Sequence, residues 1–592
     1  MLALPFSQIW AIDFEFISEP GARPVPVCMV ARELNTSRLV RLWQDQRGAE
    51  PPFPVDDDTL FVAYFASAEI GCFLELGWPV PTRILDLFTE FRRATNGIHL
   101  PSGAGLLGAL SHHGISSITS EQKTEERSLV MRGGPWTAAE RAQILNYCQT
   151  DVDPMGALLE RMLPEIEKRP NGLGQALLRG RYMAAVARME RTGVPIDVAT
   201  LDRLRANWAR IKLDLIAAID QDFGVYEGTT FKAGLFAGYL VDNKIDWPRT
   251  EAGRLALDRD TFRDMAKRYP QLYPLEELRH ALSDLRLEVL AVGPDGRNRT
   301  LLSPFRAKTG RNQPSNTKFV FGPSVWLRGL IKPTEGRALA YIDWSSQEVA
   351  IAAALSADEA LLAAVQSGDP YLAFAKMAAL APTDATKLSH KTIRDICKTC
   401  VLGTNYGMGA QSLAMRTGVS VIDAEDLLRR LAKTFPTYTA WADHVVDVGQ
   451  LRGFKSTVFG WTMRTEGALR STALRNFPMQ ANGAEMLRLA CCLATEAGVD
   501  VCAPVHDALL VEGDAATIGD TIATARAAMA EASRIVLGGL EVDTDVEVIT
   551  WPDRYADPRG KIMWERLNRL LSPNAASGDP NMASTSRFEV VT

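Results

Sequence analysis

Residues 394–407 read RDICKTCVLGTNYG, a stretch with side chains at four-residue intervals: Arg394, Lys398, Leu402 and Tyr406. On a helix of about 3.6 residues per turn these four form one stripe, with two cations at one end and an aromatic ring at the other. Gly407 is the expected helix stop. A ligand that matches the stripe carries anionic groups at one end and a flat ring at the other, as a nucleoside triphosphate does. An amphipathic helix with snorkelling cations and a packed tyrosine is the alternative interpretation.

Two other segments place carboxylates at strand ends. In YIDWSSQEVAIAAAL (341–355), β-prone residues deliver Asp343 and then give way to helical periodicity. In APVHDALLVE (503–512), His506 and Asp507 lie between two apolar runs, as at the turn of a β-hairpin. Two carboxylates on strand edges beside a cation-lined helix can hold a pair of Mg²⁺ ions against phosphates.

These motifs, in this order, resemble the catalytic region of a family A (DNA polymerase I-like) DNA polymerase. Glu348 follows Asp343 by five residues, and NFPMQ (476–480) resembles the family's Asn-x-Pro-x-Gln segment. The resemblance implies an α/β right-hand polymerase with a helical thumb, an antiparallel-sheet palm and helical fingers. It also implies template-directed addition of dNTPs to a primer 3′ end by two-metal phosphoryl transfer.

The same resemblance implies roles for individual residues. Asp343 and Asp507 would hold two Mg²⁺ ions, and Lys398 completes the catalytic set. Glu348 would exclude a ribose 2′-hydroxyl. The implied nucleotide-binding residues are Arg394, Lys398, Leu402, Tyr406, Glu348 and Tyr371. The implied DNA-binding residues are Arg311 (within Thr-Gly-Arg), Gln480, His506 and Asn476.

Three positions depart from the family's pattern. Ala508 follows Asp507 where the family has a second carboxylate, which predicts lower activity or a higher Mg²⁺ requirement. Leu402 replaces the usual aromatic one turn before Tyr406, and Tyr371 stands where relatives often have histidine. These changes suggest a specialised, bacteriophage-type replicase.

The N-terminal region carries a second carboxylate pattern. IWAIDFEF (9–16) reads as a strand with Asp13 and Glu15 on one face, suited to sharing a divalent metal, and Tyr147 and Asp151 share a helix face. A solvent-facing edge strand is the alternative. The pattern resembles the RNase H-like 3′–5′ proofreading exonuclease of the DEDD type with tyrosine, which uses two Mg²⁺ ions. In the middle motif the alignment puts Phe65 at the family's Asn and Glu69 at its metal-binding Asp, so the level of activity is open. Asp86 is the next candidate ligand.

Composition and patterning set the domain organisation. The 592 residues carry a net charge of −6, yet the run from Arg297 to Lys332 has six further cations and no acid, suited to a local nucleic-acid groove. We expect an exonuclease-like domain (1–165), a hinge (164–180), a thumb (175–300), a palm (301–349 and 454–571), fingers (350–453) and a disordered tail (572–592).

The expected partners are primer-template DNA and dNTPs, with replication accessory proteins as further candidates. The eight cysteines are scattered, and we expect them, Cys397 and Cys400 included, to be buried thiols. No signal peptide or membrane span is evident, so we expect a reducing cytoplasm, that of a bacterial host if the protein is viral. We also expect a monomer. Two other functions remain open: a DNA-binding 3′–5′ exonuclease with an impaired polymerase half, and a non-catalytic nucleic-acid scaffold.

Overall fold

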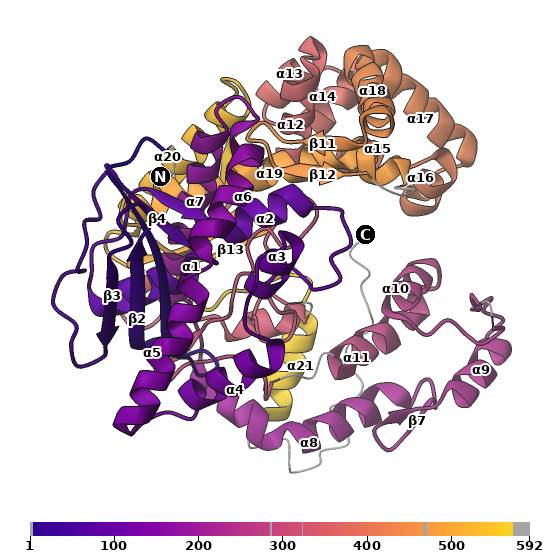
Figure 1. Cartoon of the computed structure of the whole chain (residues 1–592). Coiled ribbons are helices and arrows are strands. Elements are labelled where there is room, and N and C mark those ends of the chain that lie inside the picture. The colour runs from indigo at the N-terminus through magenta and orange to yellow at the C-terminus, as the bar shows by residue number, and fades with distance from the viewer. Residues whose placement is uncertain (1–3, 251, 284–286, 323, 466–469, 572–592) are drawn as a thin grey trace. The chain divides into compact units, whose positions relative to one another are not determined.

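The computed structural model describes residues 4–250, 252–283, 287–322, 324–465 and 470–571, and it divides into two compact units (Figure 1). The first unit comprises Met1–Gly193, Arg299–Pro314 and Gly336–Thr550. The second comprises Val194–Asn298, Ser315–Glu335 and Trp551–Thr592. The expected tail, 572–592, lies outside the described residues. The predicted boundaries of thumb, palm and fingers stay predictions.

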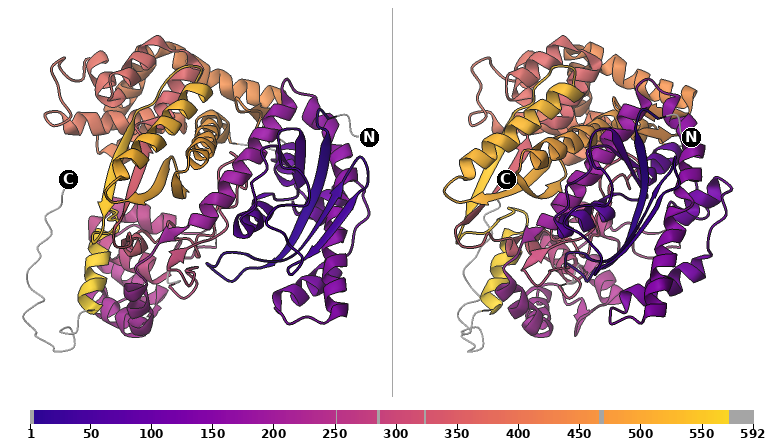
Figure 2. Two further views of the ribbon diagram at one scale, coloured as in Figure 1. Left: turned by 90° about the vertical axis from the view of Figure 1, so that its left-hand side faces the viewer. Right: turned by 60° about the vertical axis from the view of Figure 1, so that its left-hand side comes forward.

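The N-terminal part of the first unit is built on a mixed five-stranded sheet in the order β3-β2-β1-β4-β5. β1 pairs antiparallel with β2 and parallel with β4. Residues 9–12 of β1 are fully buried, as expected for a central strand covered on both faces. Figure 2 shows the indigo strands side by side with purple helices against them. The strands are β1 (Gln8–Ile17), β2 (Val25–Glu33), β3 (Leu39–Trp43), β4 (Thr59–Ala63) and β5 (Ile84–Asp86).

Seven helices accompany this sheet. α5 begins at a capping box in which Thr137 and Glu140 satisfy each other's backbone amides. α5 contacts both β1 and β2, so it brings its buried face to the strand that carries Asp13 and Glu15. The helices are α1 (Ser67–Leu76), α2 (Leu87–Thr95), α3 (Leu106–His112), α4 (Ser120–Met131), α5 (Ala138–Val152), α6 (Met155–Glu167) and α7 (Gly172–Thr192).

Most of the expected hinge over residues 164–180 is helical. α6 continues through Pro164, and Gly180 lies inside α7. A Cβ atom at Gly180 would lie 1.9 Å from the carbonyl oxygen of Ile84, so glycine is needed for the backbone of α7 to pack directly on β5. This glycine therefore serves close packing, and only residues 168–171 separate the two helices.

A buried ion cluster joins α2 to α7. Glu90 is fully buried and accepts two hydrogen bonds from Arg179, at 2.5 and 3.0 Å, and one from Arg93 at 3.0 Å. Arg179 also donates to the carbonyl oxygen of Phe459 at 3.0 Å. Because removal of one partner would leave a buried charge uncompensated, this cluster fixes the N-terminal domain against the segment that contains Phe459.

The C-terminal part of the first unit contains an antiparallel sheet in the order β13-β14-β10-β15. Its strands are β10 (Arg337–Trp344), β13 (Asp500–Val505), β14 (Ala508–Asp514) and β15 (Thr544–Thr550). The expected hairpin is present, because Val505 pairs with Ala508 across a two-residue turn. Helix α20 contacts β10 and β14 of this sheet, α19 contacts β13, and the two helices pack against each other. Their bounds are Ser471–Glu496 for α19 and Ile518–Val536 for α20.

A helical segment lies between β10 and α19. Its helices are α12 (Gln347–Ser356), α13 (Glu359–Gln366), α14 (Pro370–Met377), α15 (Lys391–Asn405), α16 (Ala410–Thr417), α17 (Val421–Thr434) and α18 (Pro436–Arg452). It ends in a short hairpin of β11 (Phe454–Ser456) and β12 (Thr462–Arg464). In Figure 1 the orange helices α15 to α18 are grouped together.

The second unit is mainly helical. Arg328 and Asp557, both nearly buried, form an ion pair of 2.5 Å inside it. Its helices are α8 (Val198–Asp220), α9 (Ala233–Asp242), α10 (Arg259–Arg268), η1 (Pro270–Leu272), α11 (Tyr273–Ser283), η2 (Val325–Leu330) and α21 (Lys561–Leu571). Its short strands are β6 (Val194–Pro195), β7 (Tyr226–Glu227), β8 (Thr230–Phe231) and β9 (Arg297–Asn298). Over the described part of the chain, no helix is both long and apolar enough to cross a membrane. All eight cysteines are buried thiols.

Candidate active sites

The first candidate site lies where β10 ends beside the β13–β14 turn. Asp343 pairs in register with Ala508, which places the turn residue Asp507 next to it. The backbone N–H of Trp344 donates to the carbonyl oxygen of Asp507 at 3.5 Å, and the two carboxyl groups are within hydrogen-bonding reach of each other. The two predicted metal ligands, 164 positions apart in the numbering, are therefore brought together.

The electrostatics of Asp343 suit a cation. Burial, followed by the carboxylates of Asp507 and Asp545, raises the pKa of Asp343 from 3.8 to about 7. Its Oδ1 atom is buried and, among the described residues, has no hydrogen-bond partner. Mg²⁺ prefers carboxylate oxygens as ligands. Asp343 and Asp507, which lie close together and repel each other when both are ionised, therefore fit this ion.

Asp545 is a residue that the sequence analysis missed. It lies on β15 directly opposite Asp343, on the other side from Ala508, and Ser345 Oγ donates to its Oδ2 at 2.8 Å. Opposed residues in an antiparallel pair project from the same face of the sheet. The position of Asp545 follows from the strand register, which no local pattern in the sequence discloses.

The predicted stripe is present on α15. Tyr406 ends the helix and Gly407 follows in the left-handed region at φ 69°. Arg394 is half-buried and its Nε donates to Asp369 Oδ2 at 2.5 Å, whereas Lys398 is exposed. Leu402 is half-buried one turn before Tyr406. The cationic end of the stripe therefore has one anchored and one accessible charge.

Tyr371 of α14 joins this cationic end. Its ring centroid lies 5.4 Å from the Arg394 guanidinium carbon and 5.7 Å from Lys398 Nζ. The ring is 4% exposed, and burial raises the pKa of its phenol. Both cations therefore sit near one aromatic ring, which holds their side chains in place by cation–π attraction. Asp369 and its bond to Arg394 were not expected from the sequence.

The Tyr406 hydroxyl connects three predicted elements. It donates to Glu348 Oε1 at 2.8 Å, and Gln480 Nε2 donates to it at 3.2 Å. The amide of Asn476, which is 6% exposed, faces the same hydroxyl. Arg311 Nε donates to the backbone oxygen of Gln480 at 3.2 Å. One network thus links α12, the end of α15 and α19.

His506 precedes Asp507 in the hairpin turn. Its side chain is exposed and its backbone lies in the left-handed region at φ 58°, which is costly for a residue other than glycine. The turn presents the imidazole to solvent beside Asp507.

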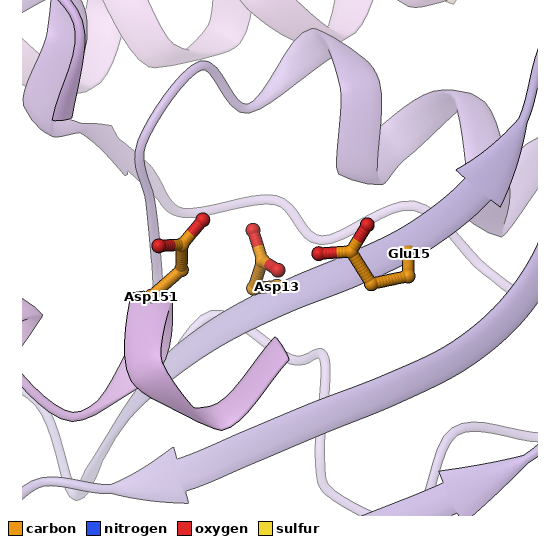
Figure 3. Close-up of side chains that lie close together, drawn as sticks. All are labelled: Asp13, Glu15 and Asp151. Carbon is orange, nitrogen blue, oxygen red and sulfur yellow. The ribbon is translucent and has the colours of Figure 1, made fainter. Parts of the chain in front are cut away.

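The second candidate site is a carboxylate cluster on the N-terminal sheet (Figure 3). Oxygen atoms of Asp13 and Glu15 on β1 and of Asp151 on α5 all lie within 4.8 Å of one another. Burial, followed by the Asp151 carboxylate, raises the pKa of Asp13 from 3.8 to about 8, and burial followed by Asp13 raises that of Glu15 from 4.5 to about 10. Such mutually repelling carboxylates fit divalent cations.

Glu69 and Asp86 differ in their surroundings. Glu69 is 3% exposed, and its Oε2 has no hydrogen-bond partner among the described residues. Burial, followed by Asp13, raises its pKa well above the usual value. Asp86, fully buried, instead accepts from the backbone N–H of Ala66 at 2.5 Å and of Thr89 at 2.6 Å. Glu69 therefore faces the cluster, while both oxygens of Asp86 already cap helices.

Three further residues border this cluster. Tyr147 is 4% exposed on α5, one turn before Asp151 as predicted. Phe65, aligned with the family's Asn, adopts φ 81° and packs its ring 5.0 Å from that of Phe88. Lys123 of α4, which the sequence analysis missed, places its Nζ 2.5 Å from Asp151 Oδ2.

Carboxylates at the end of a β-sheet, together with a helix that carries two cations, form a site suited to divalent ions and phosphate groups. A family model described as DNA polymerase family A matches residues 312–552, which include Asp343, Lys398 and Asp507. Within that segment the chain is similar to DNA polymerase family A.

Curated relatives are similar over a larger part of the chain. DNA polymerase I of Chloroflexus aurantiacus is 26% identical over 383 residues, which cover 59% of this chain and 39% of the relative. The thermostable DNA polymerase I of Thermus aquaticus is 26% identical over 418 residues, 64% of this chain and 48% of the relative. The matched part thus spans less than half of these relatives.

Among solved structures, the POL domain of Pol1 from M. smegmatis, in complex with DNA primer-template and dNTP, superposes with a TM-score of 0.69. The superposition covers 91% of this chain and 95% of the solved chain, at 18% sequence identity. At this identity the likeness confirms the fold, an α/β polymerase fold, as the sequence predicted.

Proposed function

We propose that this protein adds dNTPs to the 3′ end of a primer on a DNA template. The observation that carries this proposal is the meeting of Asp343 and Asp507 at the end of the β10 sheet, within the segment that matches DNA polymerase family A. Asp343 and Asp507 are the residues that would hold Mg²⁺. The ion would supply Lewis-acid activation and charge neutralisation for phosphoryl transfer.

The other residues position the triphosphate and neutralise its charge. Lys398, whose ammonium is exposed, and Arg394, oriented by Asp369, bind the triphosphate at the end of the stripe that Tyr371 supports. Arg394 must exchange or share its contact with Asp369 as phosphate enters. The primer 3′-oxygen attacks the α-phosphorus, and pyrophosphate leaves with the charge that Arg394 and Lys398 offset.

The Tyr406 network determines the sugar and base geometry. Glu348, held by the Tyr406 hydroxyl at 2.8 Å, stands against the C2′ position of the incoming nucleotide and excludes a ribose. Gln480 and Arg311, which contact each other through the Gln480 backbone oxygen, read minor-groove acceptors that correct base pairs share. His506 and Asn476 contact the primer-template duplex.

A second activity, 3′–5′ exonuclease, is favoured by the carboxylate oxygens of Asp13, Glu15 and Asp151 lying within 4.8 Å of one another. We propose that these residues and Glu69 hold the divalent ions of this site, and that Tyr147 orients the scissile phosphodiester. Glu69, whose side chain is longer than that of aspartate, and the ring of Phe65 set the rate of exonuclease cleavage.

A primer-extension assay with and without dNTPs tests both activities on one 5′-labelled primer. Lengthening with dNTPs supports the polymerase, and shortening without them supports the exonuclease. Shortening alone would favour the nuclease with an impaired polymerase half, and no change of either kind would favour a non-catalytic scaffold. Monomeric state, cytoplasmic location and accessory partners stay predictions.

We expect Glu348→Ala to admit ribonucleotides, raising the efficiency of rNTP relative to dNTP incorporation by about 10²-fold. Removing the carboxylate opens the space that a 2′-hydroxyl needs. Glu348→Gln is the matched control, since it keeps the volume and should retain most of the discrimination. Single-nucleotide incorporation opposite one template base measures both, and unchanged discrimination in Glu348→Ala would show that Glu348 is not the gate.

We expect the Mg²⁺ concentration for half-maximal extension to rise as pH falls below about 7. The pKa of Asp343 is raised to about 7 by burial and by neighbouring carboxylates, so below that pH a proton competes with the cation for the same oxygens. The increase should approach about tenfold per pH unit.

Mg²⁺ titrations of extension at several pH values measure this dependence. In Asp545→Asn the rise should begin at lower pH, because one of the carboxylates that raise the pKa of Asp343 is gone. A Mg²⁺ requirement that stays flat across the range would contradict the assignment of Asp343 as a ligand.

A further inference from the structure

Lys123 is the cation that faces the N-terminal carboxylate cluster. Its Nζ lies 2.5 Å from Asp151 Oδ2 and 6.0 Å from the centroid of the Tyr147 ring. Its charge also lowers the pKa of both Asp13 and Glu15, against the larger effect of burial. A side chain from α4 thus reaches the point where the three carboxylates meet.

Arg127 follows Lys123 by one helical turn on the same face of α4. Its place one turn after Lys123, whose ammonium reaches Asp151 of α5, puts it on the side of α4 that faces α5, and its charge lowers the pKa of the Tyr147 hydroxyl against the larger effect of burial. Arg127 is exposed, and no ion pair joins it to any residue that the structure describes. The two cations therefore form a short row that leads away from the cluster.

Helix α4 has stabilising contacts besides these two cations. The helix begins at a capping box of Thr119 and Gln122, buries Val130 and is tied to α5 by a hydrogen bond of 3.0 Å between Gln143 and Glu126. Arg127 has no ion pair with a described residue, and Lys123 has one, with Asp151 of the cluster itself.

A groove lies between helices α4 and α5. Its volume is about 520 Å³, within the range of ligand sites. Its lining mixes amide, hydroxyl and apolar groups with one carboxylate, that of Glu126, which is bonded to Gln143 at 3.0 Å. The groove runs past the tyrosine that borders the carboxylates, and it is large enough to take a nucleotide.

We propose that α4 binds the 3′ end of single-stranded DNA, with Lys123 contacting the scissile phosphate and Arg127 the next phosphate upstream. This inference rests on the proposed exonuclease function. A phosphodiester that approaches four carboxylates is repelled, and a cation at hydrogen-bonding distance from the reacting phosphate offsets that repulsion. If Asp151 held a divalent ion, the ammonium of Lys123 would lose this partner and would be free to meet a non-bridging phosphate oxygen.

Lys123→Gln and Arg127→Gln test the proposal in the full chain, with Arg132→Gln as the matched control. Arg132 ends the same helix and loses the same charge, but its guanidinium bonds Glu140 at 2.7 Å. Cleavage of single-stranded DNA in Mg²⁺ gives kcat and KM. Anisotropy of a labelled tetrathymidylate, measured in Ca²⁺ with saturating primer-template present, gives affinity at several salt concentrations.

Lys123→Gln should lower kcat for cleavage by about 10²-fold with a smaller change in KM. Arg127→Gln should instead raise KM and reduce the slope of log affinity against log salt by about one. Primer extension should stay unchanged in both, which shows that the chain is folded. Arg132→Gln should match the unmodified protein.

The proposal is overturned if both variants keep the original affinity and salt slope, or if Arg132→Gln has equal effects, since the charge would then act non-specifically. If the unmodified protein cleaves nothing, the proposed exonuclease function fails. The affinity and salt slope of the tetrathymidylate then decide the inference alone, because they do not depend on cleavage.

Discussion

Replacing Asp343 with asparagine or alanine is expected to abolish primer extension. Loss of a ligand for the catalytic cation removes several kcal/mol of transition-state stabilisation, which corresponds to a fall in kcat/KM of about 10³-fold or more. Asp507→Ala should have an effect of similar size, because its carboxyl lies within hydrogen-bonding reach of that of Asp343. Steady-state incorporation of one dNTP measures both.

The loss should occur without unfolding. The pKa of Asp343 is raised in the folded protein, mainly by burial. At every pH above the pKa that Asp343 has in the unfolded chain, ionisation of this carboxyl therefore lowers the free energy of unfolding. Asp343→Asn should therefore keep or raise Tm at pH 8, and binding of primer-template should change little.

Asp514→Asn is the matched control for these variants. Asp514 belongs to the same sheet but lies at the other end of β14, where it pairs with Arg337 at 2.6 Å. Its replacement should leave extension near the original rate. Near-normal extension by Asp343→Ala would remove this residue from the polymerase site.

Contacts between near neighbours in the chain were predictable from periodicity. Asp13 and Glu15 share a strand face because side chains alternate, and Tyr147 lies one helical turn from Asp151. The stripe from Arg394 to Tyr406 follows from the same geometry. In these cases the distance between side chains is set by the backbone alone.

The pairing of Asp343 with Asp507 came from the order of family motifs, because periodicity says nothing about residues so far apart. Neither periodicity nor the order of family motifs predicted the positions of Asp545 and Lys123. Asp545 reaches Asp343 through the register of β10 with β15, and Lys123 reaches Asp151 through the packing of α4 on α5. Such positions depend on tertiary packing, which a single sequence leaves open.

Gly180 has a role that its position in the sequence does not disclose. It is the last residue of the segment 164–180, for which Pro170, Asn171 and Gly172 suggested a hinge. In the structure it lies within α7, where the carbonyl oxygen of Ile84 leaves no space for a side chain. The same residue type serves flexibility or close approach, and only the packing partner decides between them.

Asp13→Ala is expected to eliminate 3′ degradation while sparing polymerisation. Asp13 lies at the centre of the oxygen cluster, so its loss removes a ligand from the ions that Asp13, Glu15 and Asp151 would share. The fall in exonuclease kcat should be about 10³-fold or more. Extension of a matched primer should be unchanged, because the two carboxylate sites lie in separate sheets and distant substitutions act independently.

Glu69→Ala should behave like Asp13→Ala, whereas Asp86→Ala should not. Glu69 faces Asp13 and has a buried oxygen without a hydrogen-bond partner in the described part of the chain, so its loss removes a ligand and relieves repulsion, leaving Tm equal or higher. Asp86 caps the backbone of Ala66 and Thr89, so its loss should lower Tm by removing a cap worth about 1–2 kcal/mol. Cleavage of single-stranded DNA and thermal melting, measured on both variants, separate the roles. Full cleavage by Glu69→Ala would move the fourth ligand elsewhere, because Glu69 would then be a buried acid without a part in the reaction.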